Sequence, residues 1–216
     1  MKMAHHPARA RGFTLVEMLI VIAIIALLAA LTMGGYTYAM NGSREKTTRG
    51  TFEAVKTALE SYKEEFGEYP EPSNPEQQVE YGMGKSYNVG GAACLYQALS
   101  GDGFDQIKGV TASGSGDASA ASDGAISGTD EVSHIMMKDM PPSMWMKKGE
   151  QYLLIDGFSR PFQYIKAEAT GDDDEATTVN STYDLWSYSM DQTNINKKSI
   201  DSLKSPQMAL KWIKNW

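Results

Sequence analysis

The sequence predicts an α+β protein in which one long N-terminal helix packs on a small antiparallel β-sheet. Two observations lead to this fold class. An apolar run at 13–33 continues into a stretch with helical periodicity that ends near Phe66. Three short segments rich in aliphatic and aromatic residues follow later, at 151–155, 161–165 and 183–188, and are typical of strands. With 216 residues, the chain is long enough for one moderate domain and an anchor.

The apolar run is long enough to cross a bilayer, yet it contains an acid. Residues 13–33 would form about 31 Å of helix, against a hydrocarbon core of about 30 Å. Lys2, Arg9 and Arg11 precede the run, which by the positive-inside rule predicts a cytoplasmic leader and a C-terminal domain across the membrane. Glu17 lies inside the run, where a mid-helix acid costs roughly 2.5–3.5 kcal/mol, so we expect it to have a partner.

Two ordinary explanations compete for this segment. A secretory signal peptide would be removed after the run, but no A-x-A cleavage pattern stands at its end. A disposable signal would also gain nothing from Glu17. A plain single-pass anchor, with Glu17 at the level of the lipid headgroups, remains open on hydropathy alone.

Beyond the run the pattern becomes amphipathic. Apolar residues step by three and four positions at Phe52, Val55, Leu59, Tyr62 and Phe66. This spacing places them on one helix face and predicts the seat of a globular domain. Gly67 and Pro70 end the predicted helix. Gly34-Gly35 and Asn41-Gly42 are predicted weak points for a bend or local melting, because glycine costs roughly 1 kcal/mol relative to alanine inside a helix.

The middle of the chain, 68–150, is predicted to be a variable, loop-rich region. Residues 70–91 are rich in Pro, Gly and Asn and predict a loop, whereas 92–99 predict a short helix. Residues 109–130 are mostly Gly, Ser, Ala, Asp and Thr, which predicts a surface excursion with little apolar mass to bury. The methionines within 135–145 are predicted to pack in the core, with a hydrophobic partner surface as the alternative.

The C-terminal part, 151–216, is predicted to hold the sheet. Asp156-Gly157 is expected to turn the first strand into the second, and the sheet is expected to lie against the amphipathic half of the helix. A short helix is predicted at 209–213. Cys94 is the single cysteine, so no intramolecular disulfide can form; we expect a buried thiol, with a reactive one as the alternative.

The start of the apolar run resembles the class III signal of type IV pilins and type II secretion pseudopilins. The resemblance is carried by RGFTLVE at 11–17, the basic residues before it and the long apolar helix after it. It implies cleavage between Gly12 and Phe13 by prepilin peptidase and N-methylation of the new amino terminus. It also implies a filament in which Glu17 of one subunit pairs with the Phe13 ammonium of a neighbour, which removes much of the cost of two unpaired charges.

The resemblance also implies how the chain is organised and where it is found. It implies a leader at 1–12, a transmembrane half of the helix at 13–35 and an amphipathic half at 36–67. The expected location is the bacterial inner membrane, with a single span and a periplasmic C-terminal domain, before entry into a filament. The implied partners are other pseudopilins or pilins, prepilin peptidase and an inner-membrane assembly platform.

Residues nearer the C-terminus resemble major pseudopilins. Residues 156–164 are similar to their D-P-W-G-x-P-Y-x-Y stretch, 183–191 to F-D-L-x-S-x-G-x-D, and 213–216 to the terminal D-I-x-N-W. This resemblance implies a calcium ion in the loop after the third strand, with Asp191 as the ligand that carries over; the alternative for Asp191 is a turn residue. The acidic run at 172–175 is predicted to be solvated rather than a metal site.

The sequence carries no catalytic constellation. It has no G-x-S-x-G, G-x-G-x-x-G, P-loop or H-E-x-x-H pattern, and His134 is the only histidine after the leader. We therefore predict that the protein is not an enzyme and has no cofactor other than the calcium considered above. The net charge of −7 also predicts no nucleic-acid partner, because phosphate binding needs clustered Lys and Arg.

The main functional prediction is a structural subunit of a pseudopilus in type II protein secretion. The alternative within the same class is a type IV pilin used for adhesion, motility or DNA uptake. The alternative from another class is a membrane-tethered binding module, for which the N-terminal segment would be only an anchor.

Overall fold

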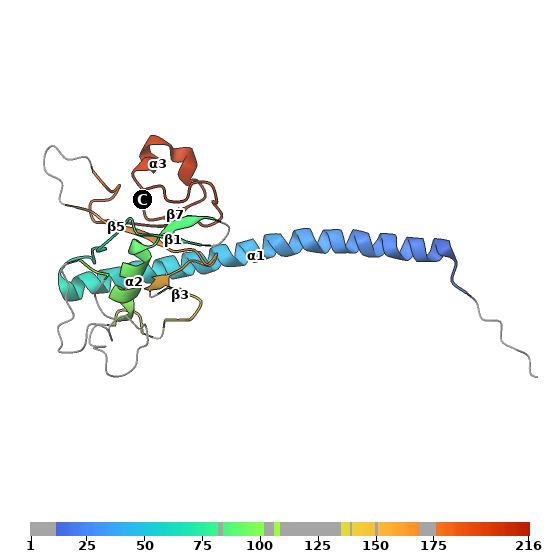
Figure 1. Cartoon of the computed structure of the whole chain (residues 1–216), viewed down its shortest axis with the longest axis horizontal. Coiled ribbons are helices and arrows are strands. Elements are labelled where there is room, and N and C mark those ends of the chain that lie inside the picture. Colours follow the sequence, from blue (N-terminus) through green and yellow to red (C-terminus); the bar gives the residue numbers. More distant parts are fainter. Residues whose placement is uncertain are drawn as a thin grey trace, which may run out of the picture. The chain divides into compact units, whose positions relative to one another are not determined.

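The computed structural model describes residues 12–81, 84–101, 106–108, 135–138, 140–149, 151–168 and 176–216 (Figure 1). The chain divides into two compact units, one ending at Gly42 and the other comprising Ser43–Trp216. Several sequence predictions lie outside the described residues: the leader up to residue 11, the surface excursion at 109–130, His134 and the acidic run at 172–175.

The predicted long helix is confirmed as α1 (Leu15–Phe66). The helix is unbroken through the glycines that we expected to weaken it, Gly34, Gly35 and Gly42. A Cβ added at each of the three would meet nothing within 4 Å, so no neighbouring group forces the chain to bend there. Their cost is therefore the intrinsic one of glycine in a helix interior, about 1 kcal/mol each relative to alanine.

The amphipathic face of α1 is also confirmed. Its buried residues all lie in the C-terminal unit: Thr48, Thr51, Phe52, Val55, Ala58, Leu59 and Tyr62. They follow the i, i+3, i+4, i+7 pattern of one helix face, so they form one stripe along the helix. The ring of Phe52 lies 6.5 Å from that of Phe162, and Val55 and Leu59 have no exposed surface. This stripe is one wall of the main hydrophobic core.

The three predicted strands are confirmed as β4 (Gln151–Leu154), β5 (Gln163–Lys166) and β6 (Tyr183–Ser187). They belong to more than one sheet. The described strands form three small antiparallel sheets, β1-β2, β3-β4 and β5-β6-β7. An isolated antiparallel bridge between Ile155 and Pro161 connects β4 to β5 through the predicted Asp156-Gly157 turn. Figure 1 shows these elements gathered around the C-terminal part of α1.

The predicted loop at 70–91 contains a hairpin that the sequence analysis missed. Its strands are β1 (Gln78–Glu80) and β2 (Ser86–Asn88), and Gly84 between them has a left-handed φ of 69°. Strands of three residues are too short for apolar alternation to emerge. A further strand, β3 (Trp145–Lys148), was missed at the end of the methionine-rich segment.

The helix predicted at 209–213 is wrong. The chain forms α3 (Asp201–Lys204) and the 3-10 helix η2 (Pro206–Ala209), and then enters β7 (Ile213–Lys214), which pairs antiparallel with β6. The ring of Trp212 stacks on that of Trp186 with centroids 6.2 Å apart, and Ile213 joins the main core. These tertiary contacts outweigh a local helical pattern.

The helix α2 (Gly90–Ser100) begins two residues before the predicted start and is buried along its whole length. Gly90 and Gly91 allow it to approach its neighbours closely. A Cβ on Gly90 would lie 1.8 Å from Asn74 O, and one on Gly91 would lie 2.6 Å from Tyr164 O. Cys94 on this helix is fully buried, as predicted. Burial raises the pKa of the thiol, which keeps it protonated and unreactive.

The methionine-rich segment packs as expected. Met144 is buried in the main core, and Met136, Met137 and Met140 lie partly buried against it. The segment is held to α2, because the backbone N–H groups of Met136 and Met137 both donate to Leu99 O, at 3.1 and 2.8 Å. The core-packing prediction is therefore confirmed for these residues.

Candidate functional site

The start of α1 is capped by three reciprocal hydrogen bonds between Thr14 and Glu17. Thr14 N and Thr14 Oγ1 both donate to Glu17 Oε2 at 2.8 Å, and Glu17 N donates to Thr14 Oγ1 at 3.2 Å. This is a capping box, which satisfies backbone N–H groups that the first helical turn leaves without partners. A carboxylate near a helix N-terminus is also favoured by the helix dipole. Glu17 therefore has a partner within its own chain.

Thr14 was not singled out by the sequence analysis, although its signal was readable. A Thr followed three residues later by a Glu, just before an apolar run, is the pattern of a capping box. The two predicted processing residues stand immediately before this motif. Gly12 and Phe13 are exposed and lie outside any helix or strand, and 78% of the Phe13 surface is exposed. The peptide bond between them is accessible without unwinding α1, although cleavage there stays a prediction.

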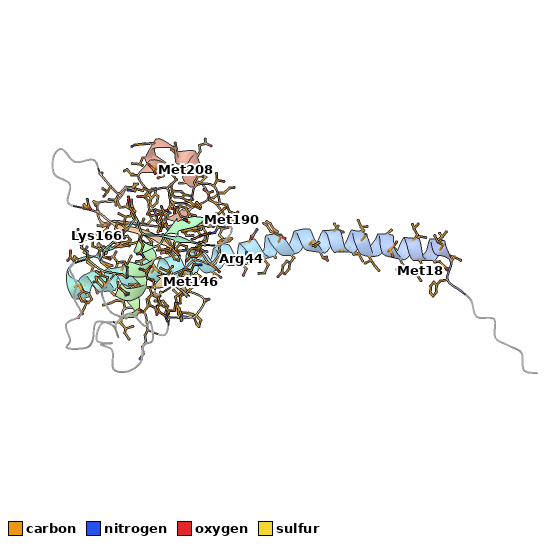
Figure 2. The ribbon with its side chains drawn as sticks, in the orientation of Figure 1. Met18, Arg44, Met146, Lys166, Met190 and Met208 are labelled. Carbon is orange, nitrogen blue, oxygen red and sulfur yellow. The ribbon has the colours of Figure 1, made fainter. Side chains whose placement is uncertain are left out.

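Among the residues that the structure describes, none covers the apolar side chains of α1 around the capping box. Every residue from 12 to 39 is exposed, and Figure 2 shows the side chains around Met18 standing out from the helix. This part of α1 is long enough and apolar enough to cross a bilayer. An apolar surface of this extent requires lipid or other protein chains around it.

The turn between β4 and β5 joins the sheets to α1. The Asp156 carboxylate is buried and accepts hydrogen bonds from Phe158 N at 2.8 Å, Arg160 N at 2.9 Å and Ser187 Oγ at 2.5 Å. Burial raises its pKa, and these hydrogen bonds oppose the shift. Gly157 N donates to Thr48 Oγ1 on α1 at 3.0 Å. The segment that resembles major pseudopilins thus attaches the turn between β4 and β5 to α1.

The predicted calcium ligand, Asp191, is occupied by N–H donors. Its Oδ1 accepts from Thr193 N at 2.8 Å and Asn194 N at 3.2 Å. Its Oδ2 accepts from Asn194 Nδ2 at 2.9 Å and Trp212 Nε1 at 3.1 Å. Burial alone would raise the pKa of this carboxyl group, but the hydrogen bonds together outweigh it and lower the pKa.

These contacts do not fit a calcium ion. Calcium takes six to eight oxygen ligands, whereas the Asp191 carboxylate faces nitrogen donors on both oxygens. Among the described residues, no three or more His, Cys, Asp or Glu side chains lie close enough together to hold a metal ion. The arrangement instead suits the alternative that the sequence left open, a residue that organises a turn.

The hydrogen bonds of Asp191 predict a pH dependence. The folded-state pKa lies below the ordinary 3.8, so the stabilisation is complete above that value and is lost as the pH falls through the folded-state pKa. We expect the thermal unfolding midpoint of the full chain in detergent to fall more steeply below about pH 4 than that of Asp191→Asn. At pH 7 Asp191→Asn should unfold about 4–8 °C lower. Parallel pH profiles for the two proteins would contradict the prediction.

Comparison with known proteins identifies the N-terminal motif. Residues 7–33 match the family described as the prokaryotic N-terminal methylation motif. The type IV major pilin protein PilA of Myxococcus xanthus (strain DK1622) is 33% identical over 98 residues, which are 43% of this chain and 43% of that protein. The match thus spans less than half of the relative's length. No solved structure matches the chain significantly.

The fold and the comparisons together define a pilin-like protein. Its long apolar N-terminal helix, followed by small antiparallel sheets packed on the helix's C-terminal half, is a pilin-like α+β fold. The relative is a pilin, a structural protein, in agreement with the prediction that the chain is not an enzyme. The similar protein is a type IV pilin, so the comparison favours our alternative prediction over the pseudopilin.

Proposed function

We propose that the chain is a type IV pilin subunit that polymerises into a filament through its N-terminal helix. The observation that carries this proposal is the methylation motif at 7–33, with its one acid in a capping box at the start of a helix whose residues up to 39 are all exposed. The similarity to a type IV major pilin supports it. The poor fit of Asp191 to calcium favours a pilin over a pseudopilin, for which the resemblance implied a calcium ion.

In this proposal the subunit first resides in the inner membrane as a single-pass protein. Prepilin peptidase cleaves between Gly12 and Phe13 on the cytoplasmic face, which leaves the apolar helix on the mature chain. The new Phe13 ammonium then pairs with Glu17 of a neighbouring subunit, and the exposed apolar surface of α1 exchanges lipid for other helices. An inner-membrane assembly platform would deliver the subunits, and the C-terminal unit would form the outside of the filament.

The proposal is tested by the intact mass and N-terminal sequence of the protein isolated from membranes. We expect a mature chain that starts at methylated Phe13. A Gly12→Val variant should keep Met1 and fail to enter filaments, because the branched side chain blocks access to the scissile bond. A wild-type chain that begins at Met1, or beyond Thr32, would contradict the proposal and favour the membrane-tethered module.

A second observation separates the pilin from the pseudopilin. We expect electron microscopy of the producing cells to show surface fibres that disappear when this chain is deleted. Cells that lack such fibres, and lose the secretion of exoproteins on deletion, would instead identify a pseudopilin. Both tests use the full chain in its own cell.

A further inference from the structure

The loop that follows β6 directs main-chain carbonyl groups toward one basic side chain. Asp191 N donates to Tyr188 O at 2.8 Å, and Ser189 has a left-handed φ of 50°. Arg160 Nη1 donates to Ser189 O at 2.6 Å and to Asp191 O at 2.7 Å. Two carbonyl oxygens thus converge on one positive group. Main-chain carbonyl oxygens of this kind also serve as ligands of metal cations.

We propose that Arg160 is the cation that closes this loop, in the place of the calcium ion that the resemblance to pseudopilins implied. The C-terminal unit would therefore fold without a metal. A guanidinium suits this role because it carries several fixed N–H donors and keeps its charge at every physiological pH. The inference concerns the folding of the C-terminal unit and does not depend on the proposed filament function.

The two carbonyl groups need this donor. Ser189 and Asp191 are 1% and 6% exposed, so water has little access to them. The Asp191 carboxylate is engaged with Thr193, Asn194 and Trp212, and does not approach Arg160 in any hydrogen bond described above. A calcium ion bound to these oxygens would have to displace the guanidinium and the N–H donors, because a guanidinium that stayed in place would repel it at close range.

Arg160 is also fixed from its other side. Its backbone N–H donates to the buried Asp156 carboxylate at 2.9 Å, and its guanidinium lies 5.7 Å from the centre of the Phe158 ring. The adjoining Gly157 donates its backbone N–H to Thr48 Oγ1 on α1. Arg160 therefore connects the loop after β6 to the turn that docks on α1.

The test measures thermal unfolding of the full chain in detergent by tryptophan fluorescence, with a calcium chelator or with millimolar calcium. We expect the wild-type midpoint to be the same in both conditions. Arg160→Gln should lower the midpoint by about 6–12 °C in both, because two buried carbonyls lose a charged donor. The midpoint of Arg160→Lys should lie between those of the wild type and Arg160→Gln, since lysine keeps the charge but lacks the planar set of N–H donors of a guanidinium.

Arg49→Gln is the matched control. Arg49 is exposed and pairs with Glu45 on the surface of α1, so its loss should shift the midpoint by at most about 2 °C. Trypsin gives a local readout, because Lys197 and Lys198 lie exposed in the same loop. We expect cleavage there to be faster in Arg160→Gln than in Arg49→Gln.

Two results would overturn the proposal. The first is a wild-type chain whose midpoint rises with calcium, which would show a metal site in spite of Arg160. The second is an Arg160→Gln variant that matches Arg49→Gln in both its midpoint and its cleavage by trypsin. Should Arg160→Gln fail to fold, the wild-type comparison and Arg160→Lys still decide the matter.

Discussion

A chain with Glu17→Val is expected to be cleaved and methylated normally but to enter filaments at least about tenfold less often than the wild type. The substitution leaves Gly12 and Phe13 unchanged, so processing continues. In the proposed filament, however, each incoming subunit would bring a Phe13 ammonium that finds no carboxylate. An unpaired charge in an apolar surrounding costs a few kcal/mol, and about 1.4 kcal/mol already corresponds to a tenfold change in an equilibrium. The measurement is the ratio of sheared filament to membrane-bound subunit on immunoblots.

The capping box complicates this experiment and also supplies its control. Glu17→Val removes the acceptor for Thr14 N as well as the charge, so weak assembly could reflect a frayed helix. Glu17→Gln keeps an amide oxygen that can accept the same hydrogen bond, because glutamine also serves at this position of a capping box. If charge pairing matters, Glu17→Gln should assemble as poorly as Glu17→Val. Assembly of Glu17→Gln at the wild-type level would mean that Glu17 acts only as a cap.

Sequence analysis correctly predicted the elements whose structure is determined by residues within the same segment. The length of the apolar run and the helical spacing from Phe52 to Phe66 are visible in the sequence, so α1 could be predicted without knowledge of the elements that pack on it. The strands β4 and β5 flank the recognisable turn Asp156-Gly157, and β6 is a run of mostly aromatic and aliphatic residues. The hairpin of β1 and β2 and the pairing of β7 are different, because strands of two or three residues exist only through their partners.

The same distinction applies to the candidate site. Glu17 stood out because a charge in an apolar run is expensive, and its partner Thr14 lies only three residues away. Arg160 had no such signal, since its contacts with Ser189 and Asp191 join residues 29 and 31 positions apart. A basic residue after a turn is ordinarily a surface residue. Asp191 is the reverse case, because a motif position predicts a metal ligand, whereas the structure surrounds its carboxylate with N–H donors.

The second large effect is expected for Gly91→Ala, which should destabilise the C-terminal unit by about 3 kcal/mol or more. An added Cβ would lie 2.6 Å from Tyr164 O and 2.8 Å from Tyr164 N, and both are backbone atoms of β5. The strand is not free to retreat. Tyr164 pairs with Leu185 in β6, and its hydroxyl donates to Pro70 O at 2.6 Å. The α2 helix, buried along its whole length, would have to move instead.

Thermal unfolding of the full chain in detergent measures this effect, and Gly50→Ala provides the matched control. We expect Gly91→Ala to lower the midpoint by about 6–12 °C. Gly50 lies inside α1 with nothing within 4 Å of an added Cβ, so the same substitution should stabilise the chain by up to about 1 kcal/mol. The opposite signs follow from one cause, the space available to a methyl group. Equal midpoints for the two variants would show that α2 does not approach β5 as closely as the structure indicates.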